Sequence, residues 1–178
     1  DEIAASLVLV TFDMPFSVAG ITERNYHGTG VIVDAERGLV VVDRNTVPVA
    51  AGDVRLTFGG SIEVPGRVEY VHPLHNLAVV SFDPKALDGT PIRAVKFDTR
   101  ELEPGEPVTV VGLGGDSRLR TLATYVATMD DVNFPLSRTL QFRDANLEVV
   151  ALVNSPSEFD GVITGKDGRV RALWSSFA

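Results

Sequence analysis

Two neighbouring serines and the three histidines of this chain are the first candidates for acyl transfer. Ser155 and Ser157 lie close together in the C-terminal part, and the histidines are His27, His72 and His75. A serine attacks a carbonyl carbon only when an imidazole takes its proton and a carboxylate orients that imidazole. No glycine follows either serine, and a proline follows Ser155. We therefore interpret both as loop serines that cap turns, with a nucleophilic role as the alternative.

His72 and His75 have a three-residue spacing that also occurs among metal ligands. Because of Pro73 and the strand-like surroundings, we expect the two imidazoles on opposite faces, and no third ligand is evident in the sequence. His75 stays open as a displaced catalytic base, whereas His27 reads as a solvated loop residue. We predict no metal site.

Two glycine-rich segments and one acidic pair complete the candidates for ligand binding. Residues 112–115 follow a predicted strand as a phosphate loop would, but the pattern is incomplete and no helix follows it. Residues 165–168 lack phosphate-loop spacing and predict a hairpin turn. Asp130 and Asp131 form an acidic pair that we interpret as solvated, with calcium binding as the alternative. We predict that the chain needs no cofactor.

The composition excludes several classes of protein. The formal net charge is −8 and no long Lys/Arg cluster exists, so we expect no nucleic-acid partner. The sequence has no apolar run long enough to span a membrane and no visible signal peptide. Without cysteine it has no disulfide, thiolate zinc site or cysteine nucleophile.

The elements that must position any site are predicted to be β-strands. Valine-rich runs recur about every ten residues and are separated by glycine and proline, which is typical of an all-β protein. Residues 35–38 and 59–60 predict hairpin turns. We expect two antiparallel barrels, or a sandwich, over residues 1–90 and 91–178, with the boundary within 83–106. The predicted strands are 6–12, 30–34, 39–43, 54–58, 61–64, 67–71, 77–82 and 92–97, followed by 108–113, 118–129, 139–142, 149–153, 161–164 and 169–174.

The alternation of apolar residues also predicts which side chains fill the first core. Within three of these strands, every second residue is apolar and is expected to point inward. The residues concerned are Leu56, Phe58, Val68, Tyr70, Ala78 and Val80.

Four segments in order resemble serine proteases of the HtrA/DegP type. Residues 28–43 resemble the strand and hairpin that precede the catalytic base in that family, and residues 68–80 resemble the segment with the catalytic aspartate. Residues 102–112 are similar to the opening of the second barrel, and residues 161–174 to the last hairpin. The likeness is greatest to the degenerate second protease-like repeat of the fungal nuclear HtrA-like protease. The resemblance implies a trypsin-like double six-stranded β-barrel.

The resemblance also implies that the catalytic triad is degenerate. Carried over residue by residue, the base falls on Asn45, the orienting acid on Asn76 and the nucleophile on Phe159. The glycine-rich nucleophile loop of the family is replaced by Ser157-Glu158-Phe159 after a proline, so we also expect no oxyanion hole.

These replacements predict a catalytically inactive pseudoprotease domain with a structural, regulatory or protein-interaction role. The alternatives are an active endopeptidase with displaced residues and a stand-alone peptide-binding module. The resemblance implies as partners an active protease domain or PDZ domains of the same parent chain, a second copy of this domain, or peptides. It implies a cell-envelope or periplasmic location if the source is bacterial, and a nuclear one if it is fungal.

Overall fold

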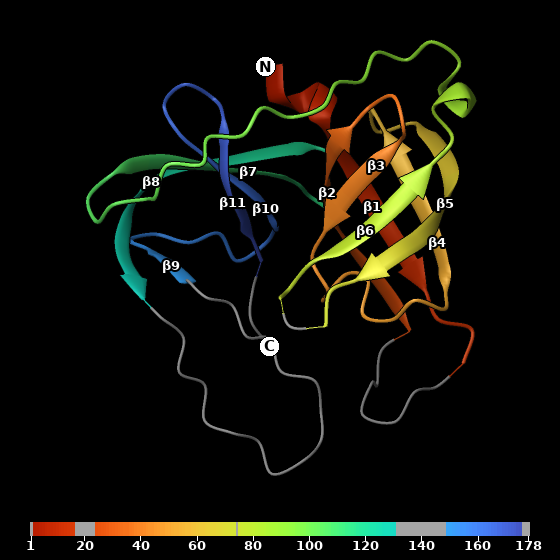
Figure 1. The fold of residues 1–178 in the computed structure, drawn as a ribbon, viewed down its shortest axis with the longest axis horizontal. Helices are drawn as coiled ribbons and strands as arrows, with labels where there is room; N and C mark the ends of the chain where they lie inside the picture. Colours follow the sequence, from red (N-terminus) through yellow and green to blue (C-terminus); the bar gives the residue numbers. More distant parts are fainter. Residues whose placement is uncertain (1, 17–23, 74, 131–148, 176–178) are drawn as a thin grey trace.

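The computed structural model describes residues 2–16, 24–73, 75–130 and 149–175. It consists of two β-sheet halves that lie side by side, with one strand-poor linker between them (Figure 1). The described helical segments are short 3-10 turns, η1 (Glu2–Ser6) and η2 (Pro84–Leu87). Across the described residues, no helix is long and apolar enough to cross a membrane.

The first half is a closed antiparallel barrel with the strand order β1-β2-β3-β6-β5-β4. Closure leaves this sheet without a free edge and encloses one apolar core. The valine-rich strands alternate as expected, so that Val8, Val10 and Phe12 of β1 are completely buried. The strands are β1 (Leu7–Asp13), β2 (Asn25–Asp34), β3 (Leu39–Val42), β4 (Asp53–Phe58), β5 (Ile62–Val71) and β6 (Ala78–Phe82).

The two predicted hairpin turns join strands of this barrel. Gly38 ends the β2–β3 turn with a φ of 65°, and Gly59 and Gly60 form the β4–β5 turn with φ of 56° and 74°. Glycine adopts this left-handed conformation without a steric penalty, which explains its presence at these positions. The predicted strands 61–64 and 67–71 are one continuous strand, β5, because Pro65 and Gly66 stay within the ladder.

One of the six predicted core residues points outward. Leu56, Phe58, Ala78 and Val80 are buried, and Val68 packs against the same core. Tyr70, by contrast, is 48% exposed. The β5–β6 register shifts between Val68 and Tyr70, so one extra residue breaks the alternation of the strand. The expectation for Tyr70 was therefore wrong.

The second half is a curled five-stranded antiparallel sheet in the described part of the chain. Its strand order is β11-β10-β7-β8-β9. The strands are β7 (Pro107–Leu113), β8 (Leu119–Asp130), β9 (Val149–Leu152), β10 (Gly161–Thr164) and β11 (Val170–Trp174). The predicted strand at 139–142 lies outside the described residues.

The linker between β6 and β7 contains no strand where residues 92–97 were predicted to form one. Instead, a single parallel bridge joins Phe97 to Val170 of β11. The backbone N–H of Asp98 donates to the Val170 carbonyl at 3.0 Å, and the Val170 N–H donates to the Lys96 carbonyl at 2.9 Å. The linker therefore covers part of the β11 edge without forming a regular ladder.

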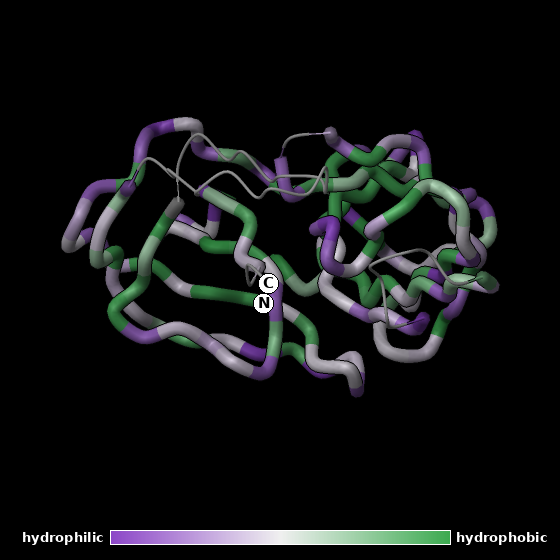
Figure 2. The backbone as a smooth tube through the Cα atoms, turned by 90° about the horizontal axis from the view of Figure 1, so that it is seen from below, coloured by the Kyte–Doolittle hydropathy of each residue, from purple (hydrophilic) through white to green (hydrophobic). Residues whose placement is uncertain are grey.

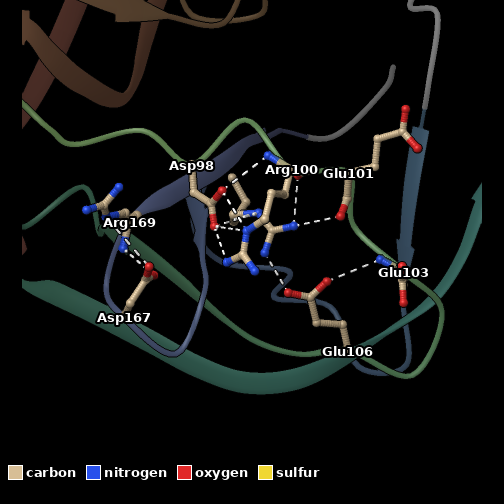
Figure 3. Close-up of polar contacts among 8 residues, drawn as sticks. Asp98, Arg100, Glu101, Glu103, Glu106, Asp167 and Arg169 are labelled. Carbon is tan, nitrogen blue, oxygen red and sulfur yellow. Dashed lines mark hydrogen bonds and ion pairs between the residues drawn. The ribbon is translucent and has the colours of Figure 1, made fainter.

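A buried arginine fastens this linker to the second half. The Arg171 side chain is 3% exposed and forms an ion pair with Glu106 at 2.5 Å. Its Nη2 atom donates to the carbonyls of Arg100 and Glu101 at 2.9 and 2.8 Å. Figure 3 shows the surrounding polar cluster, in which Asp98 and Arg100 face each other and Glu106 reaches toward Glu103.

A separate group of apolar residues lies between the two halves and joins them into one unit. Leu7 and Val31 come from the first barrel, and Val111, Val162 and Val170 from the second sheet. In Figure 2 strand segments of both halves have hydrophobic colours, whereas many connecting turns are hydrophilic. The predicted all-β class is confirmed, and the closed first barrel decides against a sandwich.

Candidate functional site

A cavity of about 290 Å³ lies between the two halves of the molecule. Both halves contribute to it: β2 and the turn after β3 on one side, the ends of β7 and β11 and the segment before β10 on the other. The lining residues are His27, Asp43, Asn45, Thr46, Leu113, Gly115, Pro156, Ser157, Glu158, Phe159, Asp160, Trp174 and Ser175.

Asn45 reaches the cavity from a tight turn that follows β3. The Thr46 backbone N–H donates to the Asp43 carboxyl at 2.7 Å, and the Val47 N–H donates to the Asp43 carbonyl at 3.1 Å. An aspartate that accepts such bonds fixes the turn that follows it. Thr46 is buried, whereas Asn45 is exposed on the cavity wall.

Asn76 lies behind this wall and links it to the end of the second sheet. Its side chain is largely buried, its Oδ1 accepts from the Arg44 backbone N–H at 2.8 Å, and its Nδ2 donates to Ser175 Oγ at 2.7 Å. Ser175 itself lines the cavity. The structure thus brings Asn76 next to the turn that carries Asn45, although the two are distant in sequence.

Phe159 approaches from the other half of the molecule. Its ring packs partly against the core of the second sheet and also lines the cavity. Gly112 of β7 leaves the space it needs, because a Cβ atom there would overlap the Phe159 ring and the Asp160 carbonyl. Asn45 and Phe159 therefore share one cavity, with Asn76 joined to its wall.

Asp160, next to Phe159, holds the two halves together through Thr29 of β2. The Thr29 N–H donates to Asp160 Oδ1 at 2.9 Å, and the Thr29 hydroxyl donates to the Asp160 carbonyl at 2.8 Å. The Leu113 N–H donates to the same hydroxyl at 2.8 Å. A Cβ atom on Gly28 would overlap Thr46 Oγ1 and Asp160 Oδ2, so glycine is required for this approach.

The carboxyl groups of Asp43 and Asp160 meet across the crevice. Asp43 is 5% exposed, and burial raises its pKa to about 7, helped by a hydrogen bond with Asp160 and by the charge of that residue. Two carboxylates in contact repel each other when both are ionised, and this repulsion contributes to the raised pKa of Asp43. Neither residue was predicted from the sequence as part of a site. The available signal was an aspartate directly after the valine run 40–42.

The other catalytic or ligand-binding candidates from the sequence lie in several parts of the structure. Ser155 and Ser157 are exposed, and Ser157 lines the cavity. His27 is on strand β2, not in a loop as expected, and also lines the cavity. Residues 112–115 comprise the end of β7 and the start of its connection to β8, and residues 165–168 form the β10–β11 turn. Asp130 accepts from the Thr128 hydroxyl at 2.7 Å, and Asp131 lies outside the described residues.

The expectation that His72 and His75 face apart was wrong. Their ring centroids are 4.5 Å apart, and the His75 backbone N–H donates to His72 Nδ1 at 2.9 Å. The reason is that β5 ends at Val71, so both histidines lie in a turn instead of a strand. Within the described residues, no group of three or more potential metal-binding side chains comes together.

The family of this chain follows from its match to a known family model. A family model described as "Trypsin-like peptidase domain" matches residues 28–159, which is most of the chain. The chain belongs to this family. The predicted resemblance to HtrA/Deg-type proteases and the trypsin-like double-barrel fold are both confirmed.

The sequence relatives of this trypsin-like peptidase domain are much longer proteins. A PDZ domain-containing protein of Schizosaccharomyces pombe is 36% identical over 169 residues, which are 94% of this chain and 17% of the relative. Pro-apoptotic serine protease NMA111 of Pyricularia oryzae is 34% identical, and Protease Do-like 7 of Arabidopsis thaliana 33%, each over 99% of this chain. The chain spans 17% of the length of each of these relatives.

Solved structures share the fold of the domain at low sequence identity. The active form of the Rv3671c protease from M. tuberculosis superposes with a TM-score of 0.68 at 15% identity, over 95% of this chain and 69% of that chain. Deg5 superposes with a TM-score of 0.66 at 13% identity, over 94% of this chain and 77% of that chain.

Proposed function

We propose that this trypsin-like peptidase domain is catalytically inactive and acts through contacts with other protein segments. The proposal rests on the identity of three residues around the crevice. Asn45, Asn76 and Phe159 occupy the positions at which the family resemblance places the base, the orienting acid and the nucleophile. Acyl transfer at such a site needs a proton acceptor and an attacking oxygen. An amide is not basic near neutral pH, and a phenyl ring has no attacking atom.

The hydrogen bonds of Asn76 support this proposal. A carboxylate at this position would only accept hydrogen bonds, whereas the Asn76 amide donates one to Ser175 Oγ and accepts one from the Arg44 N–H. The amide therefore keeps the connection between the two halves without supplying the negative charge that stabilises an imidazolium. Asn76 therefore keeps the hydrogen bonds of this position but cannot act as the orienting carboxylate of a catalytic triad.

The cross-linking of the crevice also supports a role in contact. Asp160 and Thr29 join the halves by direct hydrogen bonds at the crevice. An interface on a rigid double barrel loses little entropy when a partner binds. Because the relatives are PDZ-containing or protease proteins about six times longer, we propose other domains of one parent chain as the partners.

The inactive state predicts no labelling by a fluorophosphonate probe and no casein cleavage. The double variant Asn45→His with Asn76→Asp should stay unlabelled, because Phe159 still provides no nucleophile. Trypsin, labelled in parallel, is the positive control for the probe. His27 and Ser157 line the same cavity, so they are the pair that a displaced active site would use. Labelling of the unmodified chain that maps to Ser155 or Ser157 would contradict the proposal.

The contact role predicts association with the remainder of a parent protein. We expect the separately produced 178-residue chain and the rest of its parent to bind each other at micromolar concentration, as measured by analytical ultracentrifugation. Deletion of the domain should also change assembly or proteolysis by the parent. If the two parts stay separate and the deletion has no effect, the contact role is wrong.

A further inference from the structure

The crevice cavity combines aromatic walls with acidic side chains. Phe159 and Trp174 contribute rings, and Asp43, Glu158 and Asp160 contribute carboxyl groups. None of the described residues that line it is a lysine or an arginine, and His27 is the one imidazole among them. Aromatic faces attract cations, and a carboxylate pairs with them through charge-assisted hydrogen bonds. The lining therefore has the chemistry that recognises a cation with an apolar stem.

The cavity has the size of a side-chain pocket. Its volume of about 290 Å³ is at the lower limit of small-molecule sites. Leu113 and Pro156 add apolar surface beside the two aromatic residues, which suits the methylene stem of a long basic side chain. The site therefore fits one residue of a peptide better than a cofactor.

Among the described residues that line the cavity, no lysine or arginine offsets the charge of the carboxyl groups. The carboxyl groups of Asp43 and Asp160 contact each other, and Glu158 is exposed on the same wall. The chain as a whole carries a formal net charge of −8, which attracts cationic partners over longer distances. A guanidinium bound here would be attracted by several carboxyl groups. Its positive charge would reduce the repulsion between Asp43 and Asp160.

We propose that the crevice binds a basic side chain, of the arginine type, presented by a peptide segment of a partner protein. This inference rests on the proposed contact function and names the chemical class that the contact recognises. The aromatic rings hold the stem and the planar head, and the carboxyl groups of Glu158 and Asp160 pair with the charge.

The test uses two capped pentapeptides of alanine with one central residue, arginine in one and its uncharged isostere citrulline in the other. We expect the arginine peptide to bind the 178-residue chain about ten-fold more tightly in isothermal titration calorimetry, because citrulline keeps the shape and loses the charge. Equal affinities, or no binding of the arginine peptide up to about 5 mM, would overturn the proposal.

Matched variants locate the binding at the crevice. Glu158→Gln removes one exposed carboxylate from the cavity wall and should leave folding unaffected. It should lower the affinity for the arginine peptide about three- to ten-fold. Glu36→Gln makes the same change in the exposed β2–β3 hairpin, away from the cavity, and should leave the affinity unchanged. Equal losses in the two variants would show a general charge effect and contradict the site.

The pH dependence provides a second readout. Among the described residues that line the cavity, the charged or titratable groups beside Asp43 are Asp160, Glu158 and His27, and Arg44 follows Asp43 in the chain. Since the pKa of Asp43 is raised to about 7, binding of a cation should displace its proton and should strengthen between pH 6 and 8. His27→Gln should retain this trend, whereas Asp43→Asn should remove it. A trend that vanishes in His27→Gln would assign the proton to the imidazole and contradict the role of Asp43.

The failure of this inference can be told apart from failure of the proposed function. If the chain associates with the rest of its parent but ignores the arginine peptide, the contact role stands and the basic side chain is wrong. If the peptide binds but the parent segments do not associate, the pocket is right and the partner lies elsewhere.

Discussion

The variant Arg171→Ala is expected to unfold about 2–4 kcal/mol more easily than the wild type. Breaking a fully buried ion pair costs about 3–5 kcal/mol, because the remaining partner stays in a poorly solvated place. Glu106 would lose its ion-pair partner, and the carbonyls of Arg100 and Glu101 would lose the guanidinium donor. Since Glu106 is still 28% exposed, the cost should fall toward the lower side of that range.

Urea denaturation of this variant has a control in the same hairpin. Arg169 is 53% exposed and pairs with Asp167 at 3.6 Å, so Arg169→Ala should change the free energy of unfolding by less than about 1 kcal/mol. The unfolding free energy of Arg171→Lys should lie between those of Arg171→Ala and Arg169→Ala. An ammonium cannot bind both carbonyls and the carboxylate in the geometry of a guanidinium. An Arg171→Ala variant as stable as Arg169→Ala would show that the linker is held mainly by its backbone bonds.

The variant Asp43→Asn is expected to become more stable than the wild type as the pH rises. The pKa of Asp43 is raised to about 7 in the folded chain, from 3.8 as the usual value. Between these values the folded chain holds a proton that the unfolded chain has released. Stability therefore falls as the pH rises through this window, and the loss is complete above pH 7. At 1.36 kcal/mol for each pH unit, the difference reaches up to about 4 kcal/mol.

Asparagine imitates the protonated form of Asp43 at every pH. Its amide can donate to Asp160 and its carbonyl can accept from the Thr46 N–H. The difference between the two unfolding free energies should thus be smallest near pH 4 and largest at pH 8, as measured by urea denaturation. Asp167→Asn, at an exposed position, should show no such divergence. Parallel curves for Asp43→Asn and the wild type would mean that the carboxyl pair is ionised throughout and well solvated.

Local features of the sequence were sufficient for most of the fold. Valine-rich runs gave the strands, and Gly38, Gly59 and Gly60 gave the turns, because period-two burial and left-handed turn positions are properties of short segments. The same reasoning was wrong for Tyr70, because one extra residue in the β5–β6 ladder turns its side chain outward. It also failed for residues 92–97, since a linker can follow a sheet edge with one bridge and no ladder.

The sequence by itself determined the family and the chemical identity of Asn45, Asn76 and Phe159, the residues that we propose at the triad positions. Asparagine and phenylalanine cannot perform proton transfer or attack wherever they are placed. Only the tertiary structure decided which acidic groups meet in the crevice. Asp43 and Asp160 lie in different halves and neither belongs to a recognisable motif, yet the docking of the two halves places their carboxyl groups together and raises the pKa of Asp43. Burial and contact between distant segments are properties of the packed molecule, and no pattern in a single strand encodes them.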